Sequence, residues 1–381
     1  MKKMVCALLA AALAFSMVGC GVGASFGSDT VNVGMIGPLT GDNAIYGTAV
    51  RNGAELAVNE INAAGGINGK QIAFVPMDDK GDAIEATNAY NKLSADGMQV
   101  LVGAVTSQPT LAVAELAANE NMPVITPSAT MASITEGRPN VFRTCYTDPF
   151  QGEVLAKFLS ARDDMKRIAI IYNSSSDYST GVAQALREKC AEFGIEVVAD
   201  EAYAEADNDV NSQLTTILAA NPDAIVIPDY YKKVALIADQ ARSKGYDKPL
   251  LGPDGFDGIL GVVAEDNMAI TNNMFFANHY FSGSDDEKVV NFIKNYQAKY
   301  NETPNSFAAS AYDAVYLLKA ALENNGGDAS HDAFVNAIAS TSYAGVTGEI
   351  SYKGNGDPVK SVYVIEIKDG VYTLCDVVQG E

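Results

Sequence analysis

The segment VNVGMI, residues 31–36, is followed by an amphipathic stretch over residues 47–63 and by a second short apolar segment, QIAFVP, residues 71–76. The two short segments have the length of buried strands, and the longer one has the hydrophobic periodicity of a helix. Gly65 and Gly66 supply the positive φ angles with which helices often end. This order predicts a strand, a helix and a parallel strand, the repeating unit of α/β proteins.

The same alternation continues along the chain and restarts after Asp148-Pro149. Before this point, we expect further strands at residues 100–105 and 123–125, and helices at residues 83–95 and 110–120. After it, the expected strands are residues 167–172, 196–199, 224–227 and 249–251. The expected helices between them are residues 181–193, 210–220 and 234–244. Two consecutive blocks of this kind predict two similar lobes, each a parallel-type sheet flanked by helices.

The last third of the sequence does not restart the pattern. Three helical stretches, residues 285–300, 306–324 and 331–340, follow one another with no strand between them, and strands at residues 362–367 and 371–377 close the chain. We expect the chain to return to the first lobe with these helices and to the second with these strands. The first lobe would then comprise residues 30–146 and 278–352, and the second residues 147–277 and 353–381, joined by a three-segment hinge.

The first twenty residues are typical of an export signal. Lys2 and Lys3 precede an uncharged apolar run, residues 4–18, which is short for a permanent membrane span. The run ends in Met17-Val18-Gly19-Cys20, as in bacterial lipoprotein signals, in which the cysteine becomes the lipidated first residue. Met17 stands where such signals usually carry Leu, so a cleaved signal with an incidental cysteine is the alternative. We expect an exported protein anchored through Cys20, with residues 21–29 as a flexible tether.

Charge and cysteine content narrow the function classes. Without Lys2 and Lys3, 24 basic residues remain against 47 acidic ones, a net charge of −23. Such a surface repels nucleic acid and anionic lipid, so we expect neither as a partner and membrane contact through the lipid anchor only. Cys145, Cys190 and Cys375 allow at most one intramolecular disulfide, and the sequence leaves open which pair, if any, forms it.

Residues suited to catalysis or metal binding are scarce. The two histidines, His279 and His331, have no metal-ligand residue at a workable spacing, and no G-x-S-x-G motif occurs. The glycines of residues 65–70 resemble a phosphate-binding loop, but Gln71 replaces the Ser or Thr that holds magnesium. We therefore expect no enzyme activity, no cofactor and no metal site.

Polar and aromatic residues gather just beyond the predicted strands, where ligands bind in open parallel sheets. The members of this set are Thr106 and Ser107, the loop Ser128-Ala129-Thr130, Tyr178, Tyr230 and Asp254. Hydroxyl groups and the N-terminus of a helix that starts near Pro109 suit a carboxylate, and Asp254 suits an ammonium group. Together they describe an α-amino acid, with the two tyrosines as walls. Each residue also has a simpler reading: Ser107 as a helix cap, Thr130 as a turn residue and Asp254 as part of a Pro-Asp-Gly turn.

Four stretches carry a resemblance to a known family. They are residues 33–41 (VGMIGPLTG), 62–70 (NAAGGINGK), 123–130 (PVITPSAT) and 252–255 (GPDG). From about Val31 to the C-terminus, the chain resembles the leucine/isoleucine/valine-binding proteins of bacterial ABC importers, which have the type I periplasmic-binding-protein fold. Where members of the leucine-binding type have a disulfide in the first lobe, this sequence has Gly81 and Thr106.

The resemblance implies roles for single residues. Ser107 matches the serine that binds the ligand carboxylate, and Ser128 the residue whose backbone carbonyl accepts from the ammonium group. Thr130 matches a threonine that contacts both groups, with Ala129 beside it in the same loop, and Asp254 matches the acid that binds the ammonium. The remaining matches are Tyr178 and Tyr230 as second-lobe contacts, and Tyr46 and Phe307 near the side-chain pocket.

The resemblance also implies a mechanism. The expected protein is a monomeric, extracytoplasmic binding protein that closes around an α-amino acid, most simply a branched-chain or aliphatic one, and delivers it to an ABC permease. The alternative is a sensor of the same fold that responds to amides, urea or other amino acids.

Overall fold

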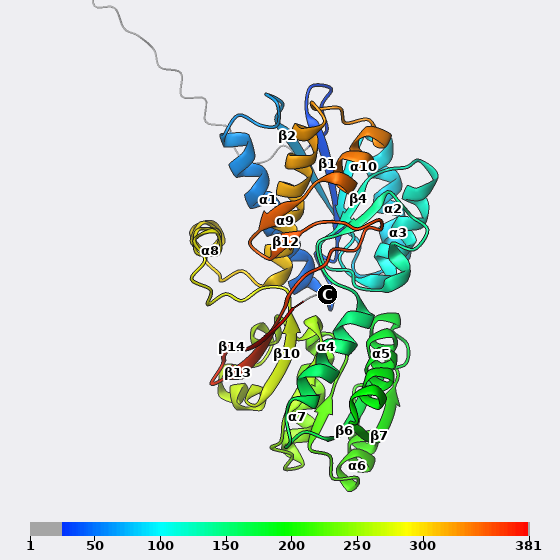
Figure 1. Cartoon of the computed structure of the whole chain (residues 1–381), viewed down its shortest axis with the longest axis vertical. Helices are drawn as coiled ribbons and strands as arrows, with labels where there is room; N and C mark the ends of the chain where they lie inside the picture. Colours follow the sequence, from blue (N-terminus) through cyan, green and yellow to red (C-terminus); the bar gives the residue numbers. More distant parts are fainter. Residues whose placement is uncertain (1–24, 380–381) are drawn as a thin grey trace, which may run out of the picture.

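Two α/β lobes lie end to end in a computed structural model that describes residues 25–379 (Figure 1). The first lobe is built on a parallel sheet in the order β2-β1-β3-β4-β5. Its strands are β1 (Val31–Gly37), β2 (Ile72–Asp78), β3 (Val100–Gly103), β4 (Val124–Thr126) and β5 (Val141–Arg143). Helices α2 (Ala83–Ala95) and α3 (Ser107–Asn119) cover one face of this sheet, and α1 (Ala44–Ala63) covers the other. The buried strand β1 and the two-sided helical cover confirm the predicted α/β class.

The second lobe has a seven-stranded sheet in the order β14-β13-β10-β9-β8-β6-β7. Its parallel strands are β6 (Arg167–Asn173), β7 (Glu196–Tyr203), β8 (Ala224–Val226), β9 (Leu250–Gly252) and β10 (Met274–Asn278). Helices α4 (Asp148–Ser160) and α5 (Asp177–Phe193) pack on one face, and α6 (Asn211–Ala219) and α7 (Tyr231–Ser243) on the other. Strands β13 (Val362–Lys368) and β14 (Val371–Val378) complete the sheet as antiparallel strands.

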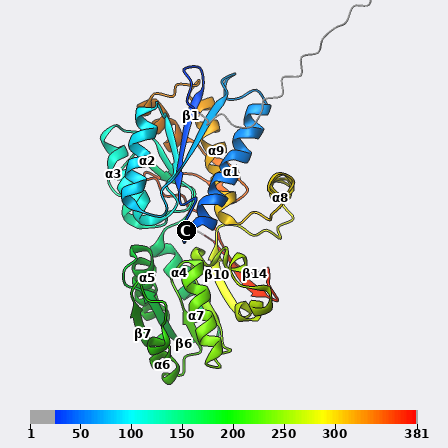
Figure 2. The same ribbon diagram turned by 180° about the vertical axis from the view of Figure 1, so that it is seen from behind.

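The last helices return to the first lobe. Helix α9 (Ser306–Asn324) packs along α1, with α8 (Glu287–Tyr300) and α10 (His331–Ser340) beside them, and a hairpin of β11 (Tyr343–Gly345) and β12 (Gly348–Ile350) follows. Seen from behind in Figure 2, α9 and α1 belong to the upper lobe and β10 and β14 to the lower one. The chain thus passes between the lobes three times, through residues 144–147, 279–286 and 351–361. This arrangement agrees with the predicted three-segment hinge.

Several elements differ from the sequence-based expectation. The sequence did not predict three elements: β5, β10 and α4. Strand β5 has only three residues, and helix α4 begins at the Asp148-Pro149 pair that marks the restart. Helices α3, α5 and α7 begin three or four residues earlier than predicted, because their first turns are polar or aromatic and carry no apolar periodicity. The corrected starts place Ser107, Tyr178 and Tyr231 in first helical turns, facing the other lobe.

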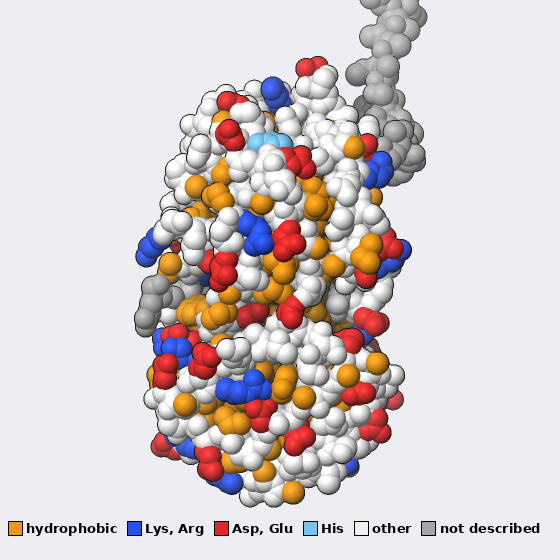
Figure 3. Space-filling model, turned by 90° about the vertical axis from the view of Figure 1, so that its right-hand side faces the viewer, with side chains coloured by type: hydrophobic (Ala, Val, Ile, Leu, Met, Phe, Trp, Pro, Cys, Tyr) orange, Lys and Arg blue, Asp and Glu red, His pale blue; other side chains and the backbone are white. Residues whose placement is uncertain are grey.

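The proposed signal sequence, Cys20 and residues 21–24 of the tether lie outside the described residues. Within residues 25–379, no helix is both long and apolar enough to cross a bilayer. Cys145, Cys190 and Cys375 are all free thiols, so none of the disulfides that the sequence allowed is formed. On the face shown in Figure 3, acidic and basic side chains are interspersed over both lobes.

The close contact between α1 and α9 depends on Gly53. A Cβ atom at this position would lie 2.0 Å from the backbone oxygen of Ala308, so Gly53→Ala must push the two helices apart. We expect the substitution to lower the free energy of unfolding by about 1–3 kcal/mol, as overpacking of a dense core does. Urea denaturation of the variant measures the loss. Gly261→Ala is the matched control, since its added Cβ meets only the flexible end of Ile45, at 3.3 Å; equal losses in the two variants would contradict the packing argument.

Candidate ligand-binding site

A small cavity lies between the lobes, at the carboxyl ends of strands from both sheets. Its lining residues are Tyr46, Val105, Thr106, Ser107, Ser128, Thr130, Tyr178, Tyr230, Asp254, Gly255 and Phe307. Eight of the nine predicted site residues therefore meet at one cavity.

Ala129 is the predicted site residue that does not line the cavity. Its backbone amide donates to the Thr126 hydroxyl at 3.1 Å, and its carbonyl accepts from Arg143 at 2.8 Å. Both polar groups of Ala129 are thus used within the first lobe. The residue holds the loop in shape, and its neighbours Ser128 and Thr130 are the ones presented to the cavity.

The first-lobe side of the cavity offers the N-terminus of α3. The residue that precedes this helix, Thr106, makes no side-chain capping bond, and Ser107 begins the helix with a side chain that is buried in the cavity wall. Backbone N–H groups at a helix N-terminus carry partial positive charge and bind anions. This end of the cavity is therefore suited to a carboxylate.

The loop after β4 is fixed by bonds to its neighbouring strand. The Ser128 hydroxyl donates to the Val105 carbonyl at 2.8 Å, and the Thr126 hydroxyl donates to the Ala104 carbonyl at 2.8 Å. The Ser128 hydroxyl proton is thus already donated within the first lobe, and Ser128 lines the cavity.

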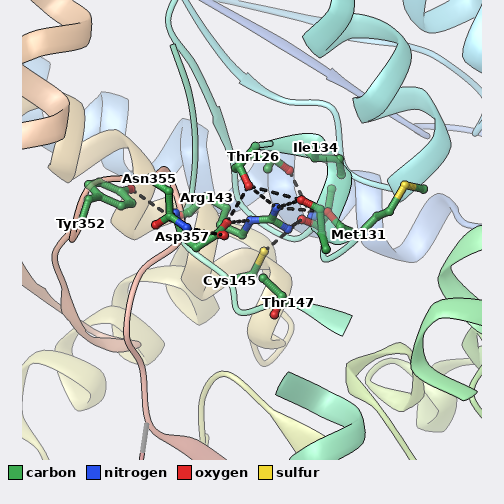
Figure 4. A network of polar contacts seen from close by, with 12 residues as sticks. Thr126, Met131, Ile134, Arg143, Cys145, Thr147, Tyr352, Asn355 and Asp357 are labelled. Carbon is green, nitrogen blue, oxygen red and sulfur yellow. Dashed lines mark hydrogen bonds and ion pairs between the residues drawn. The ribbon is translucent and has the colours of Figure 1, made fainter. Parts of the chain in front are cut away.

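A buried arginine holds the same loop from behind (Figure 4). The Arg143 guanidinium is fully buried, donates to the carbonyls of Ala129 and Met131 and to the Thr135 hydroxyl, and lies 2.6 Å from a carboxylate oxygen of Asp357. Asp357 belongs to the third crossing between the lobes. The ligand-binding loop and the hinge are thus joined by one ion pair, in which a planar guanidinium satisfies several acceptors at once.

The second-lobe side of the cavity presents the carboxyl group of Asp254. This residue begins a short 3-10 helix, η2 (Asp254–Phe256), directly after β9 and Pro253, and is 2% exposed. The Tyr178 hydroxyl donates to Oδ1 at 2.7 Å, and Oδ2 lies 3.1 Å from Nε2 of His279. A buried carboxylate is stable only with such partners, and its remaining lone pairs suit a cationic donor.

Aromatic side chains from both lobes form the walls. Tyr46 stacks on Phe307 with ring centroids 4.1 Å apart, and Tyr178 stacks on Tyr230 at 4.8 Å. The Tyr46 hydroxyl also donates to the Gly255 carbonyl across the lobes at 2.5 Å. Burial raises the pKa of Tyr46 and Tyr178 well above the ordinary value, so both hydroxyls stay neutral donors.

Further contacts hold the lobes together outside the cavity. The Tyr231 hydroxyl donates to the Asp42 carbonyl at 2.6 Å, and Lys232 forms an ion pair with the Asp42 carboxylate at 2.8 Å. Tyr231 also donates its backbone N–H to the Tyr46 hydroxyl at 3.2 Å. The structure is therefore a closed form, in which α7 of the second lobe contacts the start of α1 in the first.

The sequence did not indicate His279 as part of this site, and it placed Gly255 beside Asp254 without giving it a role. His279 follows β10, a strand that was not predicted, and it meets Asp254 only through folding. Gly255 carries a recognisable signal in the Pro-Asp-Gly turn: a Cβ there would lie 2.6 Å from the Asp229 carbonyl oxygen and 2.8 Å from the Tyr178 hydroxyl. The turn that presents Asp254 therefore requires glycine directly after the aspartate.

Two lobes that close over a small, polar-ended cavity define a two-lobed solute-binding protein. A family model described as periplasmic binding protein matches residues 30–371, and the chain belongs to this family of extracytoplasmic binding proteins. The family resemblance seen in the sequence is thereby confirmed, and so is the expectation that the chain is a binding protein and not an enzyme.

Three known proteins illustrate the relationship. The leucine-, isoleucine-, valine-, threonine- and alanine-binding protein of Pseudomonas aeruginosa is 30% identical, over 87% of this chain and 88% of its own length. A branched-chain amino acid transporter substrate-binding protein from Streptococcus pneumoniae, solved with isoleucine, is 34% identical with a TM-score of 0.85, over 92% of this chain and 99% of its own. An ABC-transporter solute-binding protein from Rhodopseudomonas palustris, solved with benzoate, is 25% identical with a TM-score of 0.83, over 92% and 97% of the two chains.

Asp357→Ala tests the ion pair behind the ligand-binding loop. The substitution leaves the buried Arg143 guanidinium without its anion, and we expect the free energy of unfolding to fall by about 3 kcal/mol, the lower end for a broken buried pair. Chemical denaturation measures the loss. Asp285→Ala, in an exposed loop, should change stability by less than about 0.5 kcal/mol. A loss of that small size for Asp357→Ala would show that Arg143 does not depend on its partner.

Proposed function

We propose that this protein is an extracytoplasmic solute-binding lipoprotein that captures an α-amino acid between its lobes and delivers it to an ABC permease. The observation that carries the proposal is the polarity of the cavity. The N-terminus of α3 and Ser107 lie on one side, and the buried carboxyl group of Asp254 lies on the other. The lining residues thus combine an anion-binding end with a cation-binding end, as a zwitterionic amino acid requires.

The proposed orientation assigns a partner to each end of the ligand. The carboxylate accepts from the Ser107 hydroxyl and from backbone N–H groups at the start of α3. The ammonium group donates to Asp254 and to the Ser128 carbonyl. Thr130 lines the same cavity, and we assign it contacts with both groups.

The proposed side-chain preference is branched-chain or aliphatic. The walls that remain for the side chain are the aromatic faces of Tyr46, Phe307, Tyr178 and Tyr230, and none of the lining residues is a lysine or an arginine that could pair with a second acid group. The relatives from Pseudomonas aeruginosa and Streptococcus pneumoniae, named for or solved with such amino acids, support the same class.

An aromatic acid is the second candidate, since a relative was solved with benzoate. Benzoate would match the anion-binding end but bring no cation to Asp254. A buried carboxylate without a cationic partner costs free energy, so the geometry favours the amino acid. For transport, we infer that the closed form is what the permease recognises, and that Cys20 supplies the lipid anchor.

A thermal-shift panel tests the ligand class. L-leucine, L-isoleucine and L-valine should raise the melting temperature, because a ligand at 100 times its dissociation constant adds about 2.7 kcal/mol of stability. Benzoate, urea and acetamide in the same panel represent the alternatives. Stabilisation by one of these three and by no amino acid would refute the proposed ligand class.

Asp254→Asn tests the ammonium-binding end. The amide keeps the shape of the side chain but loses its charge, and hydrogen bonds to charged groups contribute about 1.5–3 kcal/mol. We therefore expect the dissociation constant for L-leucine to rise about 10- to 100-fold in titration calorimetry. The exposed Asp266 gives the matched control, Asp266→Asn, which should bind as the unsubstituted protein does. If both variants bind with the same affinity, Asp254 does not contact the ammonium group.

A further inference from the structure

His279 lies where the second crossing between the lobes meets the ligand-binding cavity. It is the first residue after β10, it is 2% exposed, and its Nε2 atom lies 3.1 Å from Oδ2 of Asp254. Its ring stacks on that of Tyr146, which belongs to the first crossing, with centroids 3.7 Å apart. The histidine is therefore held between the proposed ammonium-binding acid and two of the three hinge segments.

Asn278 and His279, at the end of β10, each contact one of the two acidic side chains in the turn that follows β9. Asn278 donates to the carboxylate of Asp257 at 3.2 Å, while His279 contacts Asp254. The same carboxylate oxygen of Asp257 accepts the backbone N–H of Ser306 at 2.8 Å, at the start of α9 in the first lobe. The turn that presents Asp254 is thus tied to the hinge at one residue and to the opposite lobe at another.

The first crossing reaches Asp254 by a second route. Gln151, in the first turn of α4, accepts the backbone N–H of Asp254 at 2.9 Å. Side chain and main chain of Asp254 are therefore both positioned by residues in or next to a crossing. A change in the crossings on lobe closure would move the carboxylate with them.

We propose that His279 is a positioning residue that couples the ligand's ammonium group, through Asp254, to the hinge, and that protonation of its ring releases the ligand. The inference rests on the proposed function, because it takes an ammonium group at Asp254 as given. To that function it adds a positioning residue, His279, and a ligand affinity that falls when the His279 ring is protonated.

The hydrogen-bonding capacity of the ring explains how a proton would act. An ionised Asp254 only accepts, so the neutral ring must place its hydrogen on Nε2 to bond with it. Nδ1 has no hydrogen-bond partner among the described residues, and it is the atom that takes up a second proton. The resulting imidazolium forms an ion pair with Asp254 and competes with the ligand's ammonium group for the same carboxylate.

The surroundings determine when this proton is taken up. Burial lowers the pKa of His279, and the hydrogen bond and charge of Asp254 oppose this effect without cancelling it. Asp257 also favours the protonated ring, whereas the buried Lys360 of the third crossing disfavours it. Tyr146, which stacks on the ring, stays neutral because burial raises its pKa well above the ordinary value. His279 is therefore neutral at pH 7 and becomes charged only in acid.

Linkage gives the sign of the effect on binding. A bound ammonium group places positive charge beside Asp254 and so lowers the pKa of His279 further. Binding and protonation are reciprocal, so protonation weakens binding to the same extent. Affinity is then constant above the pKa of the free protein and falls by up to about tenfold per pH unit below it, until the pKa of the complex is reached.

The experiment follows the single histidine of the His331→Gln variant, since the sequence contains only His279 and His331. His331 is half-buried on α10 and contacts the Glu120 carbonyl, away from the cavity. In protein without a histidine tag, proton NMR titration should give His279 a pKa below the ordinary value of about 6.5. Saturating L-leucine should lower it by at least about one further unit.

Affinity measurements give the second readout. Burial raises the pKa of Asp148 to about 7, and this group acts on Asp254, so calorimetry is done in an Asp148→Asn background. There the dissociation constant for L-leucine should rise about tenfold or more from pH 7.5 to pH 5. The added substitution His279→Gln, which keeps a donor for Asp254 but cannot take up the proton, should remove this rise.

Three results would overturn the proposal. An equal His279 pKa with and without bound L-leucine would refute the coupling, and so would a pH profile that His279→Gln leaves unchanged. Should the unsubstituted protein bind none of L-leucine, L-isoleucine and L-valine at pH 7.5, the proposed function fails, and the coupling fails with it. If the protein binds the amino acid at pH 7.5 but the His279 pKa does not change, the coupling alone fails and the proposed function stands.

Discussion

The closed arrangement of the lobes depends on how the buried carboxyl group of Asp254 is hydrogen-bonded and neutralised. This group lies at the carboxyl end of β9 with one oxygen bonded to Tyr178 and the other to His279. A carboxylate removed from water needs several hydrogen bonds or a counter-charge. The described residues supply neutral donors, and no lysine or arginine lines the cavity. The closed form is therefore best satisfied when a ligand brings a positive charge.

The two lobes contribute unequally to this arrangement. In the first lobe, the loop at Ser128 is fixed by the neighbouring strand and, from behind, by the Arg143–Asp357 ion pair. These contacts do not cross the cavity, so this part of the first-lobe wall does not need the second lobe to close over it. The second lobe brings Asp254 and the tyrosine walls, which reach the ligand only as the lobes meet. In the proposed orientation, the first lobe binds the ligand carboxylate, and closure brings Asp254 to the ammonium group.

The sequence allowed the lobes, the crossings and part of the cavity lining to be predicted from local patterns, while Tyr46 and Phe307 were implied only by the family resemblance. Ser107, Ser128 and Asp254 could be found because parallel strands bring their carboxyl ends to one edge. Helix starts were placed too late where first turns are polar, as for α3 and α5. The roles of Arg143 and His279 could not be predicted from the sequence, because their partners lie far along the chain.

The contacts that hold the lobes together indicate how a ligand shifts the equilibrium between open and closed forms. Lys232 and Asp42 form an ion pair at the surface, where such pairs contribute about 0–1 kcal/mol. The hydrogen bonds of Tyr46 and Tyr231 across the lobes replace bonds to water and contribute little more each. Against them stands the desolvation of Asp254, which closure imposes whether or not a cation is present. These terms oppose one another, so a ligand that brings a cation to Asp254 shifts the equilibrium toward the closed form.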